Sequence, residues 1–435
     1  PMVPSAMVAP RATEQIRGTR RRGMAKWSHD ELRDWLAPTP GKKRMRLGLE
    51  HVKEILSRLS NPESSFPSIH VAGTNGKGSL CAHLSARGAA NGVLMGMFSS
   101  PHLVSVEERV RIDGRPISSD EFDLAISEVR LASEKEPEIE VTYFEKTMLV
   151  AMLAFRRAKI GRAVIETGLG GRLDATRCVH ADLCAITTIS EDHMEILGPT
   201  LIHILREKAG IHREGAPLVM LNPEHSDLVD EARRIIGGDL IMHSPENLDS
   251  PWVISRSMAV AIGEMLGWDI DHEDPLWPGR DSNTYRLGNN EIFLSAAHNY
   301  ESILSEMTRL KEPNTLIIGL TKKQDLHRVL APVKAAIERK MIEHVLILEP
   351  KHGRLPPENH HDIIDALGTR AMVSVPVDMK EAIELASSVS RHKGTRIMVM
   401  GSIHLVGDCI EIIHTGNGDL DPILQIHASH HSPCF

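Results

Sequence analysis

The chain has 435 residues, of which 41% are hydrophobic and 25% are charged, and its formal net charge at pH 7 is −8. This composition indicates a folded globular protein with two or more domains, because a single core stops growing at roughly 250–300 residues. The acidic balance argues against a broad nucleic-acid-binding surface, so any phosphate binding must be local. No apolar run approaches the roughly 20 residues needed to cross a bilayer, and we expect no membrane partner.

The five cysteines are scattered along the chain without a Cys-x-x-Cys pair. This usage fits a reducing compartment and predicts a cytoplasmic protein without a disulfide framework or a zinc site. Residues 1–23 are rich in arginine and lack an apolar signal core. We interpret them as a disordered extension, with a transit peptide as the alternative.

From residue 24 onward, short apolar runs alternate with amphipathic stretches, which is the pattern of βαβ units and a parallel sheet. A first series of strands is expected at 68–73, 94–98, 162–167, 183–189 and 216–221, with a helix at 147–159. A second series is expected at 314–320, 343–350, 372–377 and 396–402. The fold class is therefore α/β.

The stretch 267–283, rich in Asp, Pro and Gly, separates the two series and is interpreted as a linker,. The predicted domains are 24–272, which would bind a nucleotide, and 273–412, a smaller C-terminal α/β domain. Residues 413–435 show no periodicity and are expected to form a flexible tail, although their histidines leave metal binding as an alternative.

The most informative segment is "HVAGTNGKGSL", residues 70–80, between an expected strand and an expected helix. Its three glycines, Gly73, Gly76 and Gly78, would let the backbone approach an anion and adopt positive φ. Successive N–H groups and the helix N-terminus would then face phosphates. Lys77 would add a cation and Ser79 a hydroxyl for phosphate or Mg²⁺. An ordinary glycine-rich turn is the alternative.

Three later loops each place a candidate metal ligand after a strand: Ser100 in "SSPHL", Glu166 in "IETGLGGRLDATR" and His193 in "TISEDHMEILG". Loops after parallel strands gather at the carboxyl edge of a sheet, where ligands bind. Mg²⁺ prefers hard ligands and keeps waters and phosphate oxygens in its octahedron. A magnesium site beside the phosphate loop is therefore predicted, with a structural role for His193 as the alternative.

Several segments occur in an order that resembles folylpolyglutamate synthases and dihydrofolate synthases, which are ATP-dependent ligases related to the Mur ligases. They are "HVAGTNGKGS", "SPHL…ERVRIDGRPIS", "TYFEKT", "ETGLGGRLDAT", "DHMEILG", "EKAGI", "WPGR", "AAHN" and "GSIHLVG". The resemblance covers roughly residues 44–412. It implies a three-layer, Mur-ligase-like P-loop ATPase domain followed by a smaller domain, with the active site between them.

The resemblance also implies the chemistry. ATP with Mg²⁺ would phosphorylate a carboxylate, and the amino group of L-glutamate would displace the phosphate to form an amide. Lys208, in "REKAGI", matches a lysine that is carbamylated in this family, and the carbamate is an anion that can coordinate a second metal. Segment 142–145, "TYFE", lies where dihydropteroate-handling loops lie in the dihydrofolate-synthase-type members.

The candidate site residues form three groups by role. Catalytic candidates are Lys77, His193 and Lys208. ATP-binding candidates are Gly73, Asn75, Gly76, Lys77, Gly78, Ser79, Arg280, Ser295 and His298. Candidates for the pterin or folate site are Thr142, Tyr143, Phe144, Glu145, Leu173 and Asp174. For Tyr143 and Phe144 the alternative is a core position at the head of the following helix.

The second domain departs from the family pattern at two places. Ser295, in "SAAHN", stands where an aspartate that helps to place the nucleotide is expected, and the usual Asp-Lys-Asp reads "TKKQD" at 321–325. A serine can exchange one hydrogen bond but cannot supply a carboxylate. Weaker ATP affinity or a shifted substrate are the hypotheses that follow.

The sequence thus predicts a cytoplasmic, monomeric ligase that joins L-glutamate to dihydropteroate and uses ATP and Mg²⁺. It leaves open whether the enzyme also extends folate polyglutamate tails. A glutamate ligase for another pterin or acid is the first alternative, and a non-catalytic nucleotide-binding relative is the second.

Overall fold

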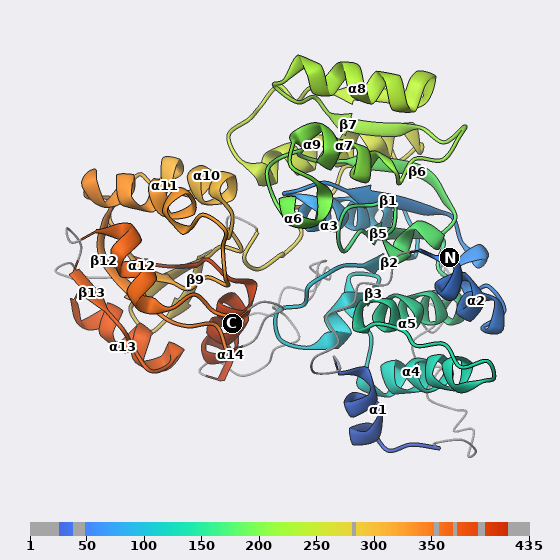
Figure 1. The fold of residues 1–435 in the computed structure, drawn as a ribbon, viewed down its shortest axis with the longest axis horizontal. Coiled ribbons are helices and arrows are strands. Elements are labelled where there is room, and N and C mark those ends of the chain that lie inside the picture. The colour runs from blue at the N-terminus through green and yellow to red at the C-terminus, as the bar shows by residue number, and fades with distance from the viewer. Residues whose placement is uncertain are drawn as a thin grey trace, which may run out of the picture.

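A computed structural model describes residues 26–37, 48–280, 284–351, 356–368, 372–389 and 396–415. The predicted extension at 1–23 and all but the first residues of the predicted tail lie outside these ranges. The described residues form two sheets, one of eight strands and one of six, each covered by helices (Figure 1). None of the helices in the described ranges is long and apolar enough to cross a lipid bilayer.

The first sheet has the strand order β4-β3-β2-β5-β1-β6-β7-β8. Its strands are β1 (Ser68–Ala72), β2 (Met95–Phe98), β3 (Val110–Ile112), β4 (Arg115–Pro116), β5 (Arg162–Glu166), β6 (Ala181–Ile186), β7 (Leu218–Leu221) and β8 (Leu240–His243). Neighbouring strands along β2-β5-β1-β6-β7-β8 pair in parallel, whereas the β2–β3 and β3–β4 pairs are antiparallel. The prediction of a parallel sheet is therefore wrong at one edge, where β3 and β4 are antiparallel.

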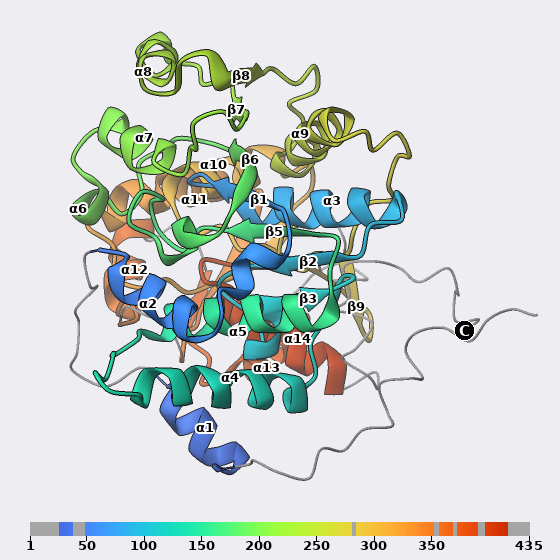
Figure 2. The same cartoon turned by 90° about the vertical axis from the view of Figure 1, so that its right-hand side faces the viewer.

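Alternate side chains of the central strands face two different helix layers, because successive residues in a strand point to opposite faces. Ile69, Val71 and Val164 pack with helices α3 (Lys77–Ala90) and α9 (Pro251–Met265). Ile165 packs on the other face, in the core beneath α5. Figure 2 shows α7 and α9 on opposite sides of β7, which gives the domain its three layers.

The remaining helices of this part lie mainly on the α5 side. They are α1 (His29–Leu36), α2 (Glu50–Arg58), α4 (Ser119–Glu134), α5 (Tyr143–Ala158), α6 (Met194–Leu197), α7 (Leu201–Ala209) and α8 (Ser226–Ile236). Large clusters of buried apolar side chains lie under α5 and under α7–α8, and their burial stabilises these faces.

The second sheet has the order β13-β12-β11-β14-β10-β9. Its strands are β9 (Thr284–Leu287), β10 (Asn290–Leu294), β11 (Asn314–Ile318), β12 (Ile342–Ile347), β13 (Met372–Ser374) and β14 (Arg396–Met400). One face is covered by α10 (Tyr300–Arg309), α11 (Leu326–Glu338) and α12 (His360–Leu367), the other by α13 (Met379–Val389) and α14 (Ile403–Thr415). Helix α14 continues beyond residue 412, so the predicted tail begins too early.

The segment that connects the two sheets, residues 268–280, contains no helix or strand. The loop after β2 makes one of the contacts between the two parts, since Leu103 and Val104 pack against the core under α14. A side chain at Gly407 would meet the backbone of Leu103. This close approach brings the carboxyl ends of both sheets to a common boundary.

Candidate active site

The turn between β1 and α3 has the conformation that its glycines predict. Gly73 has φ 147° and Gly76 has φ 87°, both in the region that favours glycine,. A Cβ atom on Gly73 would also collide with the side chain of Thr187. No side chain caps α3 at Gly76, so the first N–H groups of this helix remain available to an anion.

The turn is held by the residues that follow β6. The Asn75 N–H donates to Thr188 Oγ1 at 2.9 Å, and Thr187 Oγ1 donates to the Asn75 carbonyl at 2.7 Å. The Thr74 N–H donates to the Thr188 carbonyl at 2.7 Å. Sequence reasoning missed these threonines, although their position after a strand beside β1 is a signal that could have indicated them.

Two lysines converge on the same carbonyl of the turn. Lys77 Nζ donates to the Gly73 carbonyl at 3.1 Å and to that of Thr74 at 3.2 Å, and Lys208 Nζ donates to Gly73 at 2.7 Å. Burial and, to a lesser extent, the charge of Lys77 lower the pKa of Lys208 to about 7, with Asp192 opposing the shift. At neutral pH a large share of this amine is therefore unprotonated.

Of the predicted metal ligands, Ser100 and Glu166 are brought together. Glu166 ends β5, is 2% exposed, and accepts a hydrogen bond from the Ser100 N–H at 3.0 Å. His193 lies at the start of α6 with its ring 3.8 Å from Asp192 and 3.6 Å from Glu195. The described residues contain no cluster of three or more His, Cys, Asp or Glu side chains suited to a metal.

A hydroxyl, one buried carboxylate and an imidazole nevertheless fit Mg²⁺, because this ion keeps several waters and substrate phosphates among its ligands. A site with few protein ligands, beside a phosphate-binding loop, would leave coordination positions of Mg²⁺ open for water and phosphate oxygens. Asp192, which precedes His193, was not predicted; its carboxylate is largely buried, and its pKa is lowered because nearby cations outweigh burial.

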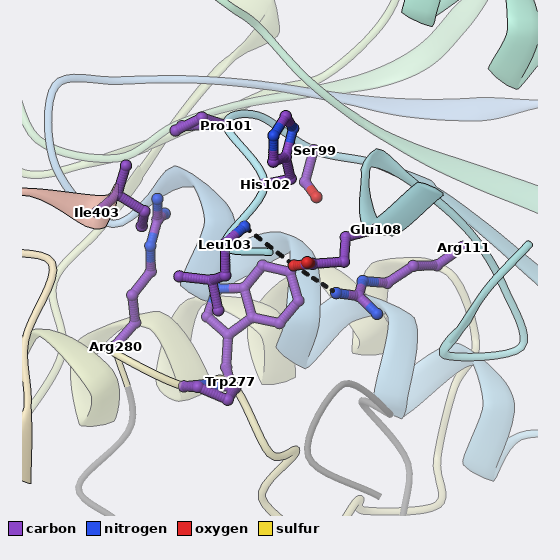
Figure 3. Close-up of a pocket in the computed structure, with 10 residues that line it drawn as sticks. Ser99, Pro101, His102, Leu103, Glu108, Arg111, Trp277, Arg280 and Ile403 are labelled. Atoms are coloured by element: carbon purple, nitrogen blue, oxygen red, sulfur yellow. Dashed lines mark hydrogen bonds and ion pairs between the residues drawn. The ribbon is translucent and has the colours of Figure 1, made fainter. Parts of the chain in front are cut away.

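A small pocket between the two parts is built around a buried carboxylate (Figure 3). Glu108 accepts hydrogen bonds from three successive backbone N–H groups, at 3.0, 2.7 and 2.7 Å, those of Leu103, Val104 and Ser105. Arg111 lies 3.7 Å from Glu108, and its guanidinium lies 5.1 Å from the ring centroid of Trp277. Glu108 therefore fixes the loop that carries Ser100 and links it to the connecting segment.

Arg280 enters this boundary from the connecting segment. It lines the pocket with Trp277, and a Cβ atom on Gly78 would collide with its guanidinium. The close approach puts a cation beside the first turn of α3, and contact of Arg280 with ATP stays a prediction.

The second-domain candidates Ser295 and His298 make hydrogen bonds within their own domain. Ser295 Oγ donates to Glu306 Oε1 at 3.1 Å and accepts from the Ala297 N–H at 3.2 Å. His298 Nδ1 donates to the Ala296 carbonyl at 2.8 Å, and burial lowers the pKa of His298 to about 4, so its ring is neutral at pH 7. The remaining ring nitrogen is then an acceptor.

The "TYFE" residues head α5. Thr142 and Glu145 form its capping box, which uses the polar atoms of both side chains. Phe144 packs on Phe98 with ring centroids 5.6 Å apart, and the Arg109 guanidinium lies 5.0 Å from the ring centroid of Tyr143. Both rings are partly buried against the core, as a core position at the head of the helix would require. Contact of either ring with a pterin stays a prediction.

Asp174 organises the loop after β5. Its carboxylate accepts from the N–H groups of Gly168, Leu169 and Thr176, each at 3.0 Å. Asp174 is 8% exposed, and burial raises the pKa of its carboxyl. Its oxygens are occupied within the loop, whereas Leu173 is only partly buried. Substrate contact by these two residues stays a prediction.

The glycine-rich turn and its two lysines lie at the boundary between two sheets that are each covered by helices. This arrangement is typical of α/β proteins that bind nucleotides. No family model matches the chain. The dihydrofolate synthetase of Saccharomyces cerevisiae is 28% identical over 424 residues, which are 85% of this chain and 98% of the relative.

Solved structures agree. Escherichia coli FolC in complex with DHPP and ADP has a TM-score of 0.74 and 26% identity, over 88% of this chain and 97% of that one. The bifunctional folylpolyglutamate synthase/dihydrofolate synthase of Yersinia pestis, complexed with AMPPNP and Mn ion, has a TM-score of 0.76 and 25% identity, over 91% and 100%. The chain is thus similar, over most of its length, to dihydrofolate synthases and folylpolyglutamate synthases.

Replacing Glu108 by alanine tests the anchor described above. We expect the free energy of unfolding at pH 7 to fall by about 3–5 kcal/mol, because Arg111 is left buried without its carboxylate and three N–H groups lose their acceptor. Urea denaturation followed by circular dichroism measures the change. Glu128→Ala removes an ion pair in which Glu128 is 41% exposed, and should cost less than about 1 kcal/mol. Equal losses in both variants would contradict the role of Glu108.

Proposed function

We propose that this protein is an ATP-dependent ligase that joins L-glutamate to dihydropteroate and so forms dihydrofolate. The observation that carries the proposal is the β1–α3 turn, in which an uncapped helix N-terminus, Lys77 and Lys208 meet beside Glu166 and Ser100. The relatives support the acceptor, since they are a dihydrofolate synthetase and a FolC protein solved with DHPP and ADP.

The reaction proceeds in two balanced steps. A carboxylate oxygen of dihydropteroate attacks the γ-phosphorus of ATP, which gives an acyl phosphate and ADP. The amine of L-glutamate then attacks the acyl carbon, and the C–O bond to phosphate breaks, which gives an amide and inorganic phosphate after loss of a proton. The first step supplies the leaving group that a carboxylate lacks, so the protein acts mainly through positioning and electrostatics.

The residues of the turn have distinct tasks in this scheme. The N–H groups of residues 76–79 bind phosphate oxygens, Lys77 balances the charge that develops during transfer, and Arg280 approaches from the opposite side. Ser100, Glu166 and His193 would hold Mg²⁺, which neutralises phosphate charge when bound. Tyr143, Phe144 and Leu173 would offer apolar surface to the pterin.

Lys208 is proposed to react with CO₂ to form a carbamate. That reaction requires the neutral amine, and burial supplies it by lowering the pKa of Lys208 to about 7. The carbamate would place a negative charge near Lys77. We also propose that the enzyme works as a monomer in the cytoplasm.

The first experiment measures phosphate release from ATP with Mg²⁺ and L-glutamate, with dihydropteroate or tetrahydrofolate as the acceptor. We expect turnover with dihydropteroate, and additional turnover with tetrahydrofolate would establish polyglutamate extension. Turnover with tetrahydrofolate alone would contradict the acceptor. No turnover with either dihydropteroate or tetrahydrofolate, in a protein that binds ATP, would favour another acid as the acceptor.

Lys208→Ala should reduce turnover at least 100-fold, because the carbamate cannot form, while the fold persists. In the unchanged protein, activity should rise with pH between about 6 and 8, as the neutral fraction of the amine rises from about one-tenth to nine-tenths. Added bicarbonate should help most at the lower pH. Lys53→Ala, at an exposed lysine, is the control. Near-normal turnover of the Lys208 variant would remove the carbamate from the mechanism.

Glu166→Gln should raise the Mg²⁺ concentration for half-maximal activity about tenfold or more, since the substitution removes the only carboxylate among the predicted ligands. Magnesium titrations at saturating ATP give this value. Glu264→Gln, on the exposed side of α9, should leave it unchanged. An unaltered magnesium dependence in the Glu166 variant would show that this carboxylate is not a ligand.

A further inference from the structure

The loop between β6 and α6, residues 187–193, is contacted by the second domain at its charged end. Arg328 Nη1, in the first turn of α11, lies 2.5 Å from Glu191 Oε2. The same guanidinium lies 5.3 Å from the ring centroid of Tyr300, at the start of α10. Figure 1 shows α6 on the side of the first domain that faces α10 and α11.

A second cation faces the next residue of the loop. Lys323 is partly buried; burial lowers its pKa, and the carboxylates of Asp192, Glu358 and Glu195 oppose that shift. Its backbone is fixed, because the Lys323 N–H donates to Glu358 Oε1 at 2.6 Å and Glu358 is 3% exposed. The side chain therefore starts from a rigid point, and Asp192 is one of the carboxylates that favour its charged form.

The second domain also contacts the phosphate-binding turn. The side-chain amide of Asn299, the residue before α10, donates to Asn75 Oδ1 at 2.9 Å. Asn75 is also the residue held by Thr187 and Thr188 at the start of the same loop. The second domain thus touches both ends of one hydrogen-bonded unit, the turn and the loop that carries His193.

We propose that Lys323 and Arg328 are positioning residues, through which the second domain holds residues 191–193 and so sets His193 relative to the phosphate-binding turn. The inference rests on the proposed function only for its effect on turnover. It also gives a role to the unusual segment "TKKQD", since Lys323 stands two residues before Asp325, at the position of the first aspartate in the family pattern. Arg328, three residues after Asp325, forms the ion pair with the first domain.

The contact is tested without any substrate by amide hydrogen exchange in the full chain. Arg328→Gln and Lys323→Gln should each speed exchange in peptides covering 187–198 by about three- to tenfold, because a local opening becomes easier, while peptides in β1 and β5 stay unchanged. Arg396→Gln is the control, since Arg396 is similarly exposed and pairs within the second domain with Glu291 and Glu312. Exchange equal to that of the unchanged protein in both variants would overturn the proposal.

A charge exchange separates specific pairing from general disruption. Arg328→Glu alone should speed exchange in 187–198, and Arg328→Glu combined with Glu191→Arg should restore it at least in half. Failure of the double variant to recover any protection would exclude the Arg328–Glu191 pair as the cause.

The functional readout is the Mg²⁺ concentration for half-maximal turnover, which Lys323→Gln should raise about threefold or more by displacing His193, with little change in the KM for the pterin. An unchanged magnesium dependence would overturn the effect on His193. If the unchanged protein shows no ligase turnover, the proposed function has failed, and the exchange experiment still decides the contact.

Discussion

The β1–α3 turn is the constraint on which the rest of the molecule depends. A loop that presents successive N–H groups to phosphate needs positive φ at Gly73 and Gly76, and such a backbone gains little stability from its own hydrogen bonds. It persists because Thr187 and Thr188 bind Asn75 from the adjacent strand's loop. Sheet order is thereby tied to function, since only a β1–β6 neighbour relation brings these residues together.

Charge is distributed around this turn with a clear physical logic. Lys77 and Lys208 share the Gly73 carbonyl, and burial together with the nearby charge of Lys77 lowers the pKa of Lys208,. The same arrangement favours any anion placed between them. Glu166 and Ser100 lie beside the turn through the loop that Glu108 anchors, so the phosphate cradle and the metal candidates are positioned by one continuous set of contacts.

Much of this could be predicted from the sequence, because it depends on local signals. Gly73, Gly76 and Gly78 between an apolar strand and a helix indicate the turn directly, and the strands of both series are formed within a few residues of their expected bounds. Strands β3, β4, β8, β9 and β10 were not predicted. Of these, β3 and β4 have only three and two residues, too short for any periodicity. Glu108 and Asp192 were missed because their roles depend on partners that only the fold brings near. Thr142 and Asp174, which the sequence predicts at the substrate site, also form capping and loop hydrogen bonds that the sequence analysis did not predict.

The second domain shows why one substitution cannot be judged alone. Ser295 replaces the aspartate of the family pattern, and its hydroxyl lies 3.1 Å from Glu306. An aspartate at 295 would put two carboxylates within contact distance, where they cannot both ionise without a large cost. Burial already raises the pKa of Glu306, and Arg309, 2.7 Å away, offsets part of this effect. Serine at 295 and glutamate at 306 are therefore compatible as a pair. The carboxylate absent from position 295 is present on α10 as Glu306, which pairs with Arg309. The second domain contacts the first through other residues, among them Asn299 and Arg328.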